Sequence, residues 1–223
     1  MKSRYDYAYA VGRVRALEAR WIPEAIFRNA VEADSLDEVL NILSEFVHAE
    51  AIKKISNSRD LEFFLIERVN RLNNTVSRLL DDEQLTGALF SLSEDLILAK
   101  DRVSKVQLEF LENLLMHIVK LNDLTTYLRL NLSDKITDFM RGDYGDIARQ
   151  ASQAKQKENS YLSLEKLKPA FILKFLGGAK YITFGPEPII SYYFAELNQI
   201  RLLRWVILGK INQVPKDKLL ALI

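Results

Sequence analysis

The segment from Ile189 to Leu208 constrains the fold most, because its apolar run is almost long enough to cross a bilayer. A transmembrane helix needs about 20 mostly apolar residues with few or no charges. Glu196, Arg201 and Arg204 lie inside this run, and each central arginine would cost about 2.5–3.5 kcal/mol on insertion. We therefore expect a core helix that is packed on several faces inside an all-helical protein.

The polar residues of this segment do not fall on a single stripe of the helix. Placed at about 100° per residue, Glu187, Ser191 and Asn198 lie on one side, whereas Glu196 projects from nearly the opposite side. With protein packed on both sides, Glu196 is expected to be buried. A buried carboxylate needs a partner, and we expect an arginine of the same helix or of the N-terminal helix.

The composition of the chain excludes several classes of site. None of its 223 residues is a cysteine, which rules out disulfides, thiolate metal sites and a cysteine nucleophile. The 31 basic and 30 acidic residues almost cancel, and the net charge of +1 gives no indication of nucleic-acid binding. The first residues lack the apolar core of a signal peptide, so we expect a cytoplasmic protein.

Charge is distributed unevenly along the chain. Residues 1–20 hold five basic and two acidic side chains, and residues 201–223 hold five basic and one acidic. Residues 24–50 hold seven acidic side chains and one basic. Ordinary solvated helix faces account for such runs, but the polarity also fits an acidic partner or an anionic membrane surface near the termini.

Helical periodicity runs through nearly the whole chain, which predicts an all-α protein of two or three packed helical bundles. A possible short extended piece at Tyr181–Phe184 is the exception. We expect the first helix over about residues 3–20. One side of it carries a ridge of small residues that would let another helix approach closely. The ridge consists of Ala8, Gly12, Ala16 and Ala19.

Two apolar seams follow in the middle of the chain. Apolar residues keep a spacing of four and three from Leu65 to Leu79 and again from Leu85 to Phe110, with Asp81-Asp82 between them. Two such seams joined by a short polar turn predict an antiparallel helical hairpin. The polar segment Ala148–Ser160 is expected to be a linker or an exposed helix.

We expect a single domain, residues 1–223, made of smaller helical bundles. The possible sub-bundles are about 1–57, 58–145 and 160–223.

No catalytic constellation stands out in the sequence. Glu45 and His48 have the Glu-x-x-His spacing of helical di-iron proteins, but a second pair is missing, because Leu114 lies three residues before His117. The glycines near Lys180 lack the spacing of a phosphate-binding loop. We therefore expect no catalytic residue, metal, cofactor, small-molecule substrate or nucleic-acid partner.

Two segments near the ends of the chain are similar to signatures of one family. Residues Tyr7–Glu18, YAYAVGRVRALE, look like the opening helix of the C subunit of V/A-type rotary ATPases, whose eukaryotic counterpart is the d subunit. Residues Phe184–Tyr192, FGPEPIISY, resemble the family's closing signature, in which a long helix ends in Gly-Lys as at Gly209-Lys210. A weaker similarity lies at Leu121–Arg129.

The resemblance implies a function that needs no active site. It implies a non-catalytic socket of three-helix bundles that transmits torque for ATP-coupled H+ or Na+ transport. The implied partners are the central-stalk subunits and the membrane proteolipid ring, and the implied location is the cytoplasmic surface of that ring. The positions that match the signatures, for which structural or interface roles are implied, are Tyr7, Gly12, Arg13, Arg15, Gly185, Pro186, Glu187, Tyr192, Glu196, Arg201, Gly209 and Lys210.

Two other classes of function fit the same sequence. A free-standing helical adaptor would use the predicted hairpin to self-associate or to bind a partner helix. A helical enzyme with an unrecognised site would need a pocket of convergent groups with perturbed pKa values.

The chain is shorter than typical members of the family it resembles by about one bundle. This length fits either two bundles or three trimmed ones.

Overall fold

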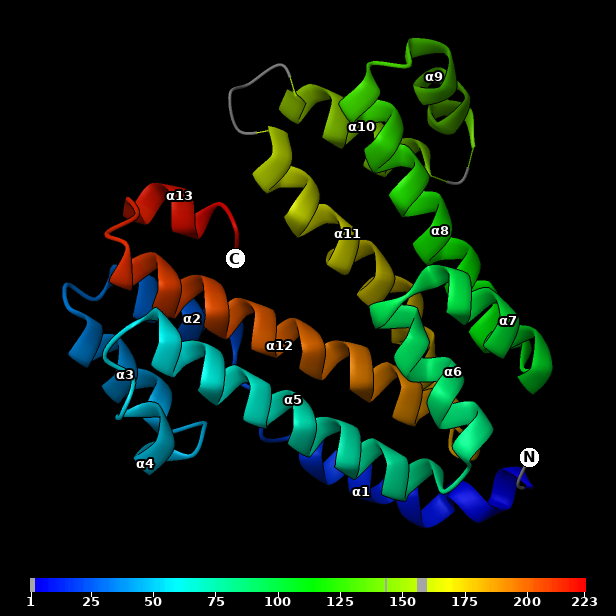
Figure 1. Ribbon diagram of the computed structural model, residues 1–223, viewed down its shortest axis with the longest axis horizontal. Coiled ribbons are helices and arrows are strands. Elements are labelled where there is room, and N and C mark those ends of the chain that lie inside the picture. Colours follow the sequence, from blue (N-terminus) through cyan, green and yellow to red (C-terminus); the bar gives the residue numbers. More distant parts are fainter. Residues whose placement is uncertain (1–2, 143, 156–159) are drawn as a thin grey trace. The chain divides into compact units, whose positions relative to one another are not determined.

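The computed structural model describes residues 3–142, 144–155 and 160–223, with side chains outside 154–165 (Figure 1). Over these residues the regular secondary structure is helical throughout, with thirteen α-helices, two short 3-10 helices and no strand. The predicted all-α fold is therefore confirmed. The extended piece expected at Tyr181–Phe184 does not form, because Tyr181 ends a 3-10 helix that begins at Gly177.

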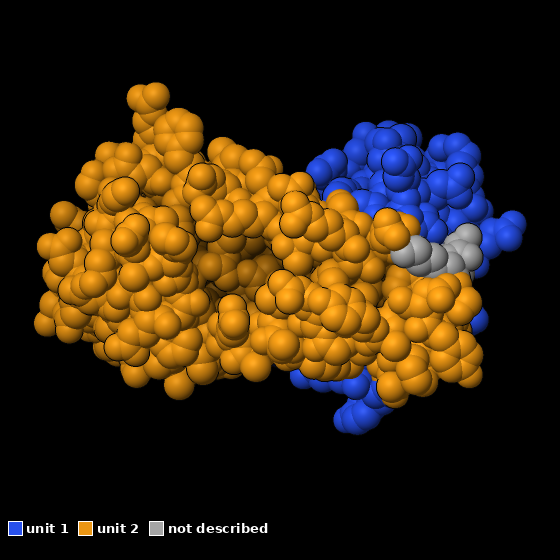
Figure 2. All heavy atoms as spheres, turned by 90° about the horizontal axis from the view of Figure 1, so that it is seen from below, with its two compact units in different colours: residues 1, 82–181 blue, residues 2–81, 182–223 orange. Residues whose placement is uncertain are grey.

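The chain forms two compact units (Figure 2). Unit 1 contains residues 82–181, and unit 2 contains residues 2–81 together with 182–223. Unit 2 is thus built from two separate stretches of the chain, and unit 1 is inserted between them in sequence. The sub-bundles expected at about 1–57, 58–145 and 160–223 stay a prediction.

Unit 2 consists of one long helix and the helices packed around it. The elements of this unit are η1 (Arg4–Tyr7), α1 (Ala8–Glu18), α2 (Glu24–Glu32), α3 (Leu36–Ser44), α4 (Ala49–Ile52), α5 (Ser58–Leu80), α12 (Glu187–Ile211) and α13 (Lys216–Leu220). Helix α12 runs beside α5, and it also contacts α1, α2, α3 and α13 (Figure 1).

Helix α12 is the core helix that the sequence predicts. Its buried residues lie on several faces, and the charged residue Glu196 is among them with 8% of its surface exposed. The helix is therefore covered by protein along both of its sides. The apolar side chains that it buries include Ile189, Ile190, Tyr193, Ile200, Leu203, Val206 and Ile207. Within the described ranges, no helix combines the length and the apolarity needed to cross a membrane.

The residues that flank α5 in the sequence set both of its ends. The Asn57 carboxamide oxygen accepts hydrogen bonds from the backbone N–H groups of Arg59 and Asp60 at 2.9 and 3.1 Å. These bonds satisfy donors that the first turn of a helix leaves without a helical acceptor. Asp81 ends the helix in the left-handed conformation with φ at 47°.

Unit 1 packs its helices around an aromatic and aliphatic core. Its elements are α6 (Glu83–Glu94), α7 (Leu96–Val106), α8 (Glu109–Leu130), α9 (Ser133–Arg141), α10 (Gly145–Lys155), α11 (Ser160–Leu176) and η2 (Gly177–Tyr181). Helix α8 contacts α7, α9 and α11, and α10 contacts α9 and α11. The core includes Leu121, Leu124, Leu128, Tyr144 and Ile147.

The polar segment Ala148–Ser160 is not a linker in its described part. Helix α10 continues through it to Lys155, and Ala148 and Ala151 are buried in the core of unit 1. The small alanines supply the buried face, while the polar residues between them take the outer face. Residues 156–159 of the segment lie outside the described residues.

The predicted hairpin of the two apolar seams is wrong. Helix α5 packs on α12 in unit 2, whereas α6 and α7 pack on each other in unit 1. The second seam is broken at Asp95, whose carboxylate accepts hydrogen bonds from the backbone of Ile97 at 2.8 Å and of Leu98 at 3.2 Å. Regular apolar spacing continues across such a cap, so the spacing alone did not reveal the turn.

Within the described chain, no other helix covers the small-residue ridge expected to receive one on α1. Ala8, Gly12, Ala16 and Ala19 are all exposed, and a Cβ added at Gly12 would meet nothing within 4 Å. The helix instead buries its other side through Ala10, Val11 and Val14. Val11 and Val14 favour burial of this side, because they remove more apolar surface from water than alanine or glycine does.

The cap at Asp95 yields a stability prediction. We expect Asp95→Ala to destabilise unit 1 by about 1 kcal/mol, the usual cost of losing an N-cap, and Asp95→Ser to restore most of it. Chemical denaturation followed by circular dichroism measures the change. A continuous helix through this position would give the opposite sign, because alanine is the better residue in a helix interior.

Candidate functional site

The first group of signature residues forms the turn that leads into α12. Gly185 has φ at 124°, and a Cβ there would lie 2.2 Å from Glu187 Oε2 and 2.8 Å from Arg4 Nη2. Only glycine fits such a position without strain. Glu187 is buried and accepts a hydrogen bond from Arg4 Nη1 at 2.8 Å, and Arg4 also donates to the Phe184 carbonyl at 3.0 Å.

The turn therefore brings the start of α12 against the start of the described chain. Tyr5 packs on Phe184 with ring centroids 5.1 Å apart, next to the pair of Arg4 and Glu187. Pro186 precedes the helix and Pro188 lies in its first turn, where the missing N–H group removes no helical hydrogen bond. The closing signature thus has a structural role at this point.

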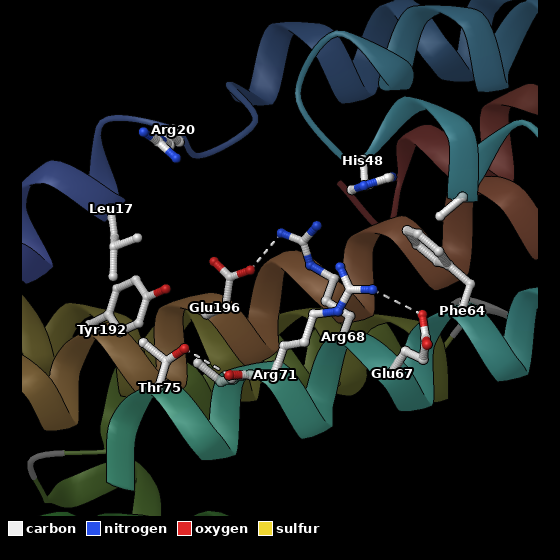
Figure 3. A pocket seen from close by; sticks show the side chains of 12 residues that line it. Leu17, Arg20, His48, Phe64, Glu67, Arg68, Arg71, Thr75, Tyr192 and Glu196 are labelled. Atoms are coloured by element: carbon white, nitrogen blue, oxygen red, sulfur yellow. Dashed lines mark hydrogen bonds and ion pairs between the residues drawn. The ribbon is translucent and has the colours of Figure 1, made fainter. Parts of the chain in front are cut away.

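The second group lies around Glu196 in the middle of α12. Its carboxylate accepts one hydrogen bond from Arg68 at 2.5 Å (Figure 3) and another from Trp21 Nε1 at 3.0 Å. The expected burial and pairing of Glu196 are confirmed. The expected origin of the partner is wrong, since Arg68 belongs to α5, which runs beside α12.

Tyr192 lies one turn before Glu196 and completes this group. Its ring stacks on Trp21 with centroids 6.2 Å apart and planes 7° from parallel. Burial raises the pKa of Tyr192 to about 12, and the negative charge of Glu196 acts in the same direction. The hydroxyl is therefore protonated at neutral pH.

A neighbouring polar contact fixes the chain that leaves α1. Gln199 accepts a hydrogen bond from the Ile22 N–H at 3.1 Å and donates one to the Ile22 carbonyl at 3.3 Å. Both backbone groups of Ile22 are thus satisfied by a single side chain of α12. Such pairing lets a non-helical segment pack against a buried helix without orphaned polar groups.

The third group lies at the end of α12. Lys210 donates hydrogen bonds to the carbonyls of Val31, at 2.7 Å, and Ala33, which belong to the C-terminal end of α2. A cation is favourable there because the last carbonyls of a helix lack partners. Burial lowers the pKa of Lys210, and the positive charge of Lys216 adds to this effect.

Gly209 and Lys216 hold the last helix, α13, next to the C-terminal ends of α12 and α2. A Cβ at Gly209 would lie 2.4 Å from a methyl carbon of Leu219, so the glycine lets α13 approach α12. Lys216 donates to the Glu32 carbonyl and forms an ion pair of 2.8 Å with Asp34. The hydrogen bond from Lys216 lowers the pKa of the Asp34 carboxyl and raises that of the lysine.

The remaining signature residues are spread over the surface of unit 2 and its core. Tyr7 is buried at 1% exposure, while Gly12 and Arg13 are exposed on α1. Arg15 pairs with Glu18 at 2.8 Å on the same helix. Arg201 donates to Asn198 at 2.8 Å and lies over the Trp205 ring at 4.6 Å. Interface roles for these positions stay a prediction.

Of the signature residues, Tyr192 and Glu196 line a pocket together. The cavity has a volume of about 350 Å³ and lies within unit 2 (Figure 3). Sequence reasoning missed its basic residues Arg20, Arg68 and Arg71. One signal existed for Arg68, which lies three residues after Leu65 and four before Leu72, on the buried side of α5.

Glu45 and His48 have the spacing of metal ligands, but they do not belong to a metal centre in the described residues. Across the described residues, no three histidine or acidic side chains lie close enough to hold a metal ion together.

Comparison with known proteins identifies the family. The profile of the ATP synthase (C/AC39) subunit family matches residues 103–222, which is more than half of the chain. No curated protein and no solved structure matches the chain. The matched range contains α12 with its turn and its final Gly-Lys, whereas the Tyr7–Glu18 segment lies before it.

The chain belongs to the ATP synthase (C/AC39) subunit family. The predicted family is therefore confirmed; the match contains the closing signature, and the resemblance of Tyr7–Glu18 stays a prediction. Membership implies a subunit of the central stalk of a V/A-type ATPase, and the members of this class are non-catalytic components of the complex.

The pair of Glu196 and Arg68 yields a second prediction. We expect Glu196→Ala to destabilise unit 2 by about 3 kcal/mol, because it leaves a largely buried guanidinium without its carboxylate. This value is at the low end for buried pairs, since the Arg68 side chain keeps 23% exposure. Urea denaturation measures the change. Glu67→Ala is the matched control, because its exposed pair with Arg71 contributes only about 0.5 kcal/mol. Equal effects of the two substitutions would contradict the assignment.

The turn before α12 yields a third prediction. We expect Gly185→Ala to lower stability by about 1–3 kcal/mol, because a side chain is strained at this φ and collides with Glu187. Gly178→Ala serves as the control, since a Cβ there meets nothing within 4 Å. Thermal unfolding of the two variants should differ clearly, and equal melting temperatures would show that the turn relaxes.

Proposed function

We propose that the chain is a non-catalytic coupling component of the rotor of a V/A-type ATPase. In this role it links the central-stalk subunits to the membrane proteolipid ring and transmits torque for ATP-coupled H+ or Na+ transport. The family match supports the class of complex. The partners, the cytoplasmic side and the peripheral attachment to the membrane are parts of the proposal.

The observation that supports torque transmission best is how α12 is held. Its 25 residues correspond to a length of about 37 Å at 1.5 Å per residue. Polar contacts from other elements reach its start at Glu187, its middle at Glu196 and its end at Lys210. A part that passes torque on must not twist internally, and contacts at three points along one helix oppose such twisting.

Some of the charged residues in the basic and acidic segments pair with each other inside unit 2. Lys210 and Lys216 of the basic C-terminal segment contact the acidic region near Glu32 and Asp34. These lysines are therefore poor candidates for docking onto another protein of the complex. The basic residue Arg13 is exposed on α1 beside the exposed ridge of small residues, which makes this face of α1 the better candidate for an interface.

Affinity purification tests the proposal. The tagged full chain is expressed in its native host in place of the untagged copy, and membranes are solubilised gently at low salt. We expect the stalk subunits and the proteolipid to be recovered with it, as identified by mass spectrometry. The untagged strain is the control for non-specific recovery, and a high-salt wash shows whether the association depends on charge.

A coupling measurement in the same strains tests the mechanical role. Membranes that lack the chain should retain some ATP hydrolysis by the head but lose ATP-driven ion uptake into vesicles. Recovery of the chain alone, or as a soluble homodimer, with ion uptake unchanged in its absence, would contradict the proposal and favour the helical adaptor.

A further inference from the structure

The pocket of unit 2 has a chemistry that the rotor role does not use. Three guanidinium groups reach it, from Arg20 after α1 and from Arg68 and Arg71 on α5, against two carboxylates, those of Glu67 and Glu196 (Figure 3). The pocket therefore holds a surplus of one positive charge. His48 lines the same pocket.

The carboxylate of Glu196 does not neutralise the extra positive charge of the pocket, because it is already paired. One of its oxygens accepts a hydrogen bond from Arg68 and the other from Trp21. This carboxylate is therefore already engaged by donors of the protein. Arg68 itself retains a buried Nε–H group with no acceptor in the described structure. A buried donor without an acceptor is costly, which favours a ligand that supplies oxygen atoms.

The other two arginines are available to a ligand. Arg71 pairs with Glu67 through a single contact of 3.1 Å, and both side chains are more than 60% exposed. Exposed pairs of this kind hold weakly and exchange easily for another anion. The side chain of Arg20 makes no hydrogen bond or ion pair with the part of the chain that the structure describes, and only its backbone N–H bonds to Leu17.

The kinds of groups that line the pocket suit a tetrahedral oxyanion. The arginines come from two different segments, and His48 stands at the start of α4. Guanidinium groups donate in pairs to phosphate oxygens, and donors from several directions match an ion with several oxygens. The hydroxyl groups of Tyr192 and Thr75 line the pocket as neutral polar groups. A cavity of about 350 Å³ accommodates a phosphate together with part of a larger molecule.

We propose that this pocket is a binding site for a phosphoryl oxyanion, either inorganic phosphate or the phosphate of a nucleotide. The proposal does not depend on the rotor role. Arg20 and Arg71 are the residues that bind the ligand, while Arg68 is held in place by Glu196 and offers its remaining donors. In a component of an ATP-driven complex, such a site would let the concentration of a reactant or product alter the stability of unit 2.

The two histidines of the chain allow a direct test. Inorganic phosphate is titrated into the purified full chain at constant ionic strength, and the two histidine C2–H signals are followed by proton NMR. We expect saturable movement of the His48 signal. The His117 signal is an internal control, because that ring lies in unit 1 against Tyr144. Sodium chloride in place of phosphate should move neither signal.

Matched double variants then locate the site. We expect Arg20→Gln combined with Arg71→Gln to weaken phosphate binding by at least about tenfold, because two charged donors are lost. Arg13→Gln combined with Arg78→Gln removes one exposed arginine from α1 and one from α5 but none from the pocket, and should leave binding unchanged. The single variants Arg20→Gln and Arg71→Gln decide the question if the double variant does not fold.

Isothermal titration with ATP separates the two sources of the ligand. Tighter binding of ATP than of phosphate, lost in the pocket variant, identifies a nucleotide site, and equal or weaker binding of ATP identifies a phosphate site. The proposal is overturned if nothing saturates by about 10 mM phosphate, a concentration that fills sites with millimolar Kd. It is also overturned if the pocket variants and the control bind alike.

Discussion

The paired carboxylate of Glu196 is the constraint on which the arrangement of unit 2 depends. An apolar helix such as α12 could pack in many rotations and positions along its axis, because the hydrophobic effect has no direction. The carboxylate removes most of this freedom, since it must meet Arg68 on α5 and Trp21 after α1 at the same time. A shift of α12 by one turn, about 5.4 Å, would separate all three groups.

The contacts at the two ends of α12 also fix the position of this helix, but through other pairs of groups. Glu187 meets a cation from the start of the described chain, and Lys210 meets carbonyls at the end of α2. Each contact joins residues more than 170 positions apart in sequence. The signature residues of the closing segment therefore serve first to build unit 2, and any interface uses a surface that this construction leaves exposed.

The sequence predicts α12 well and its surroundings less well. The charges inside its apolar run exclude a membrane span, and the position of Glu196 around the helix indicates burial. The identity of its partner could not be predicted, because Arg68 lies 128 residues away and several arginines were equally plausible. The break at Asp95 is hidden in the sequence, since apolar spacing survives an N-cap. The pocket could not be predicted either, because its lining comes from segments that only the fold brings together.

The insertion of unit 1 into unit 2 has a consequence for synthesis on the ribosome. The first 81 residues of the chain cannot bury their apolar faces until α12 emerges, and about 100 residues of unit 1 are made in between. At about 5–20 residues per second, the nascent helices wait on the order of ten seconds with their core surface exposed. Unit 1 is contiguous and can fold during this delay. The chain therefore completes its inserted part first and its enclosing part last, and the unfinished enclosing part is a natural client for chaperones.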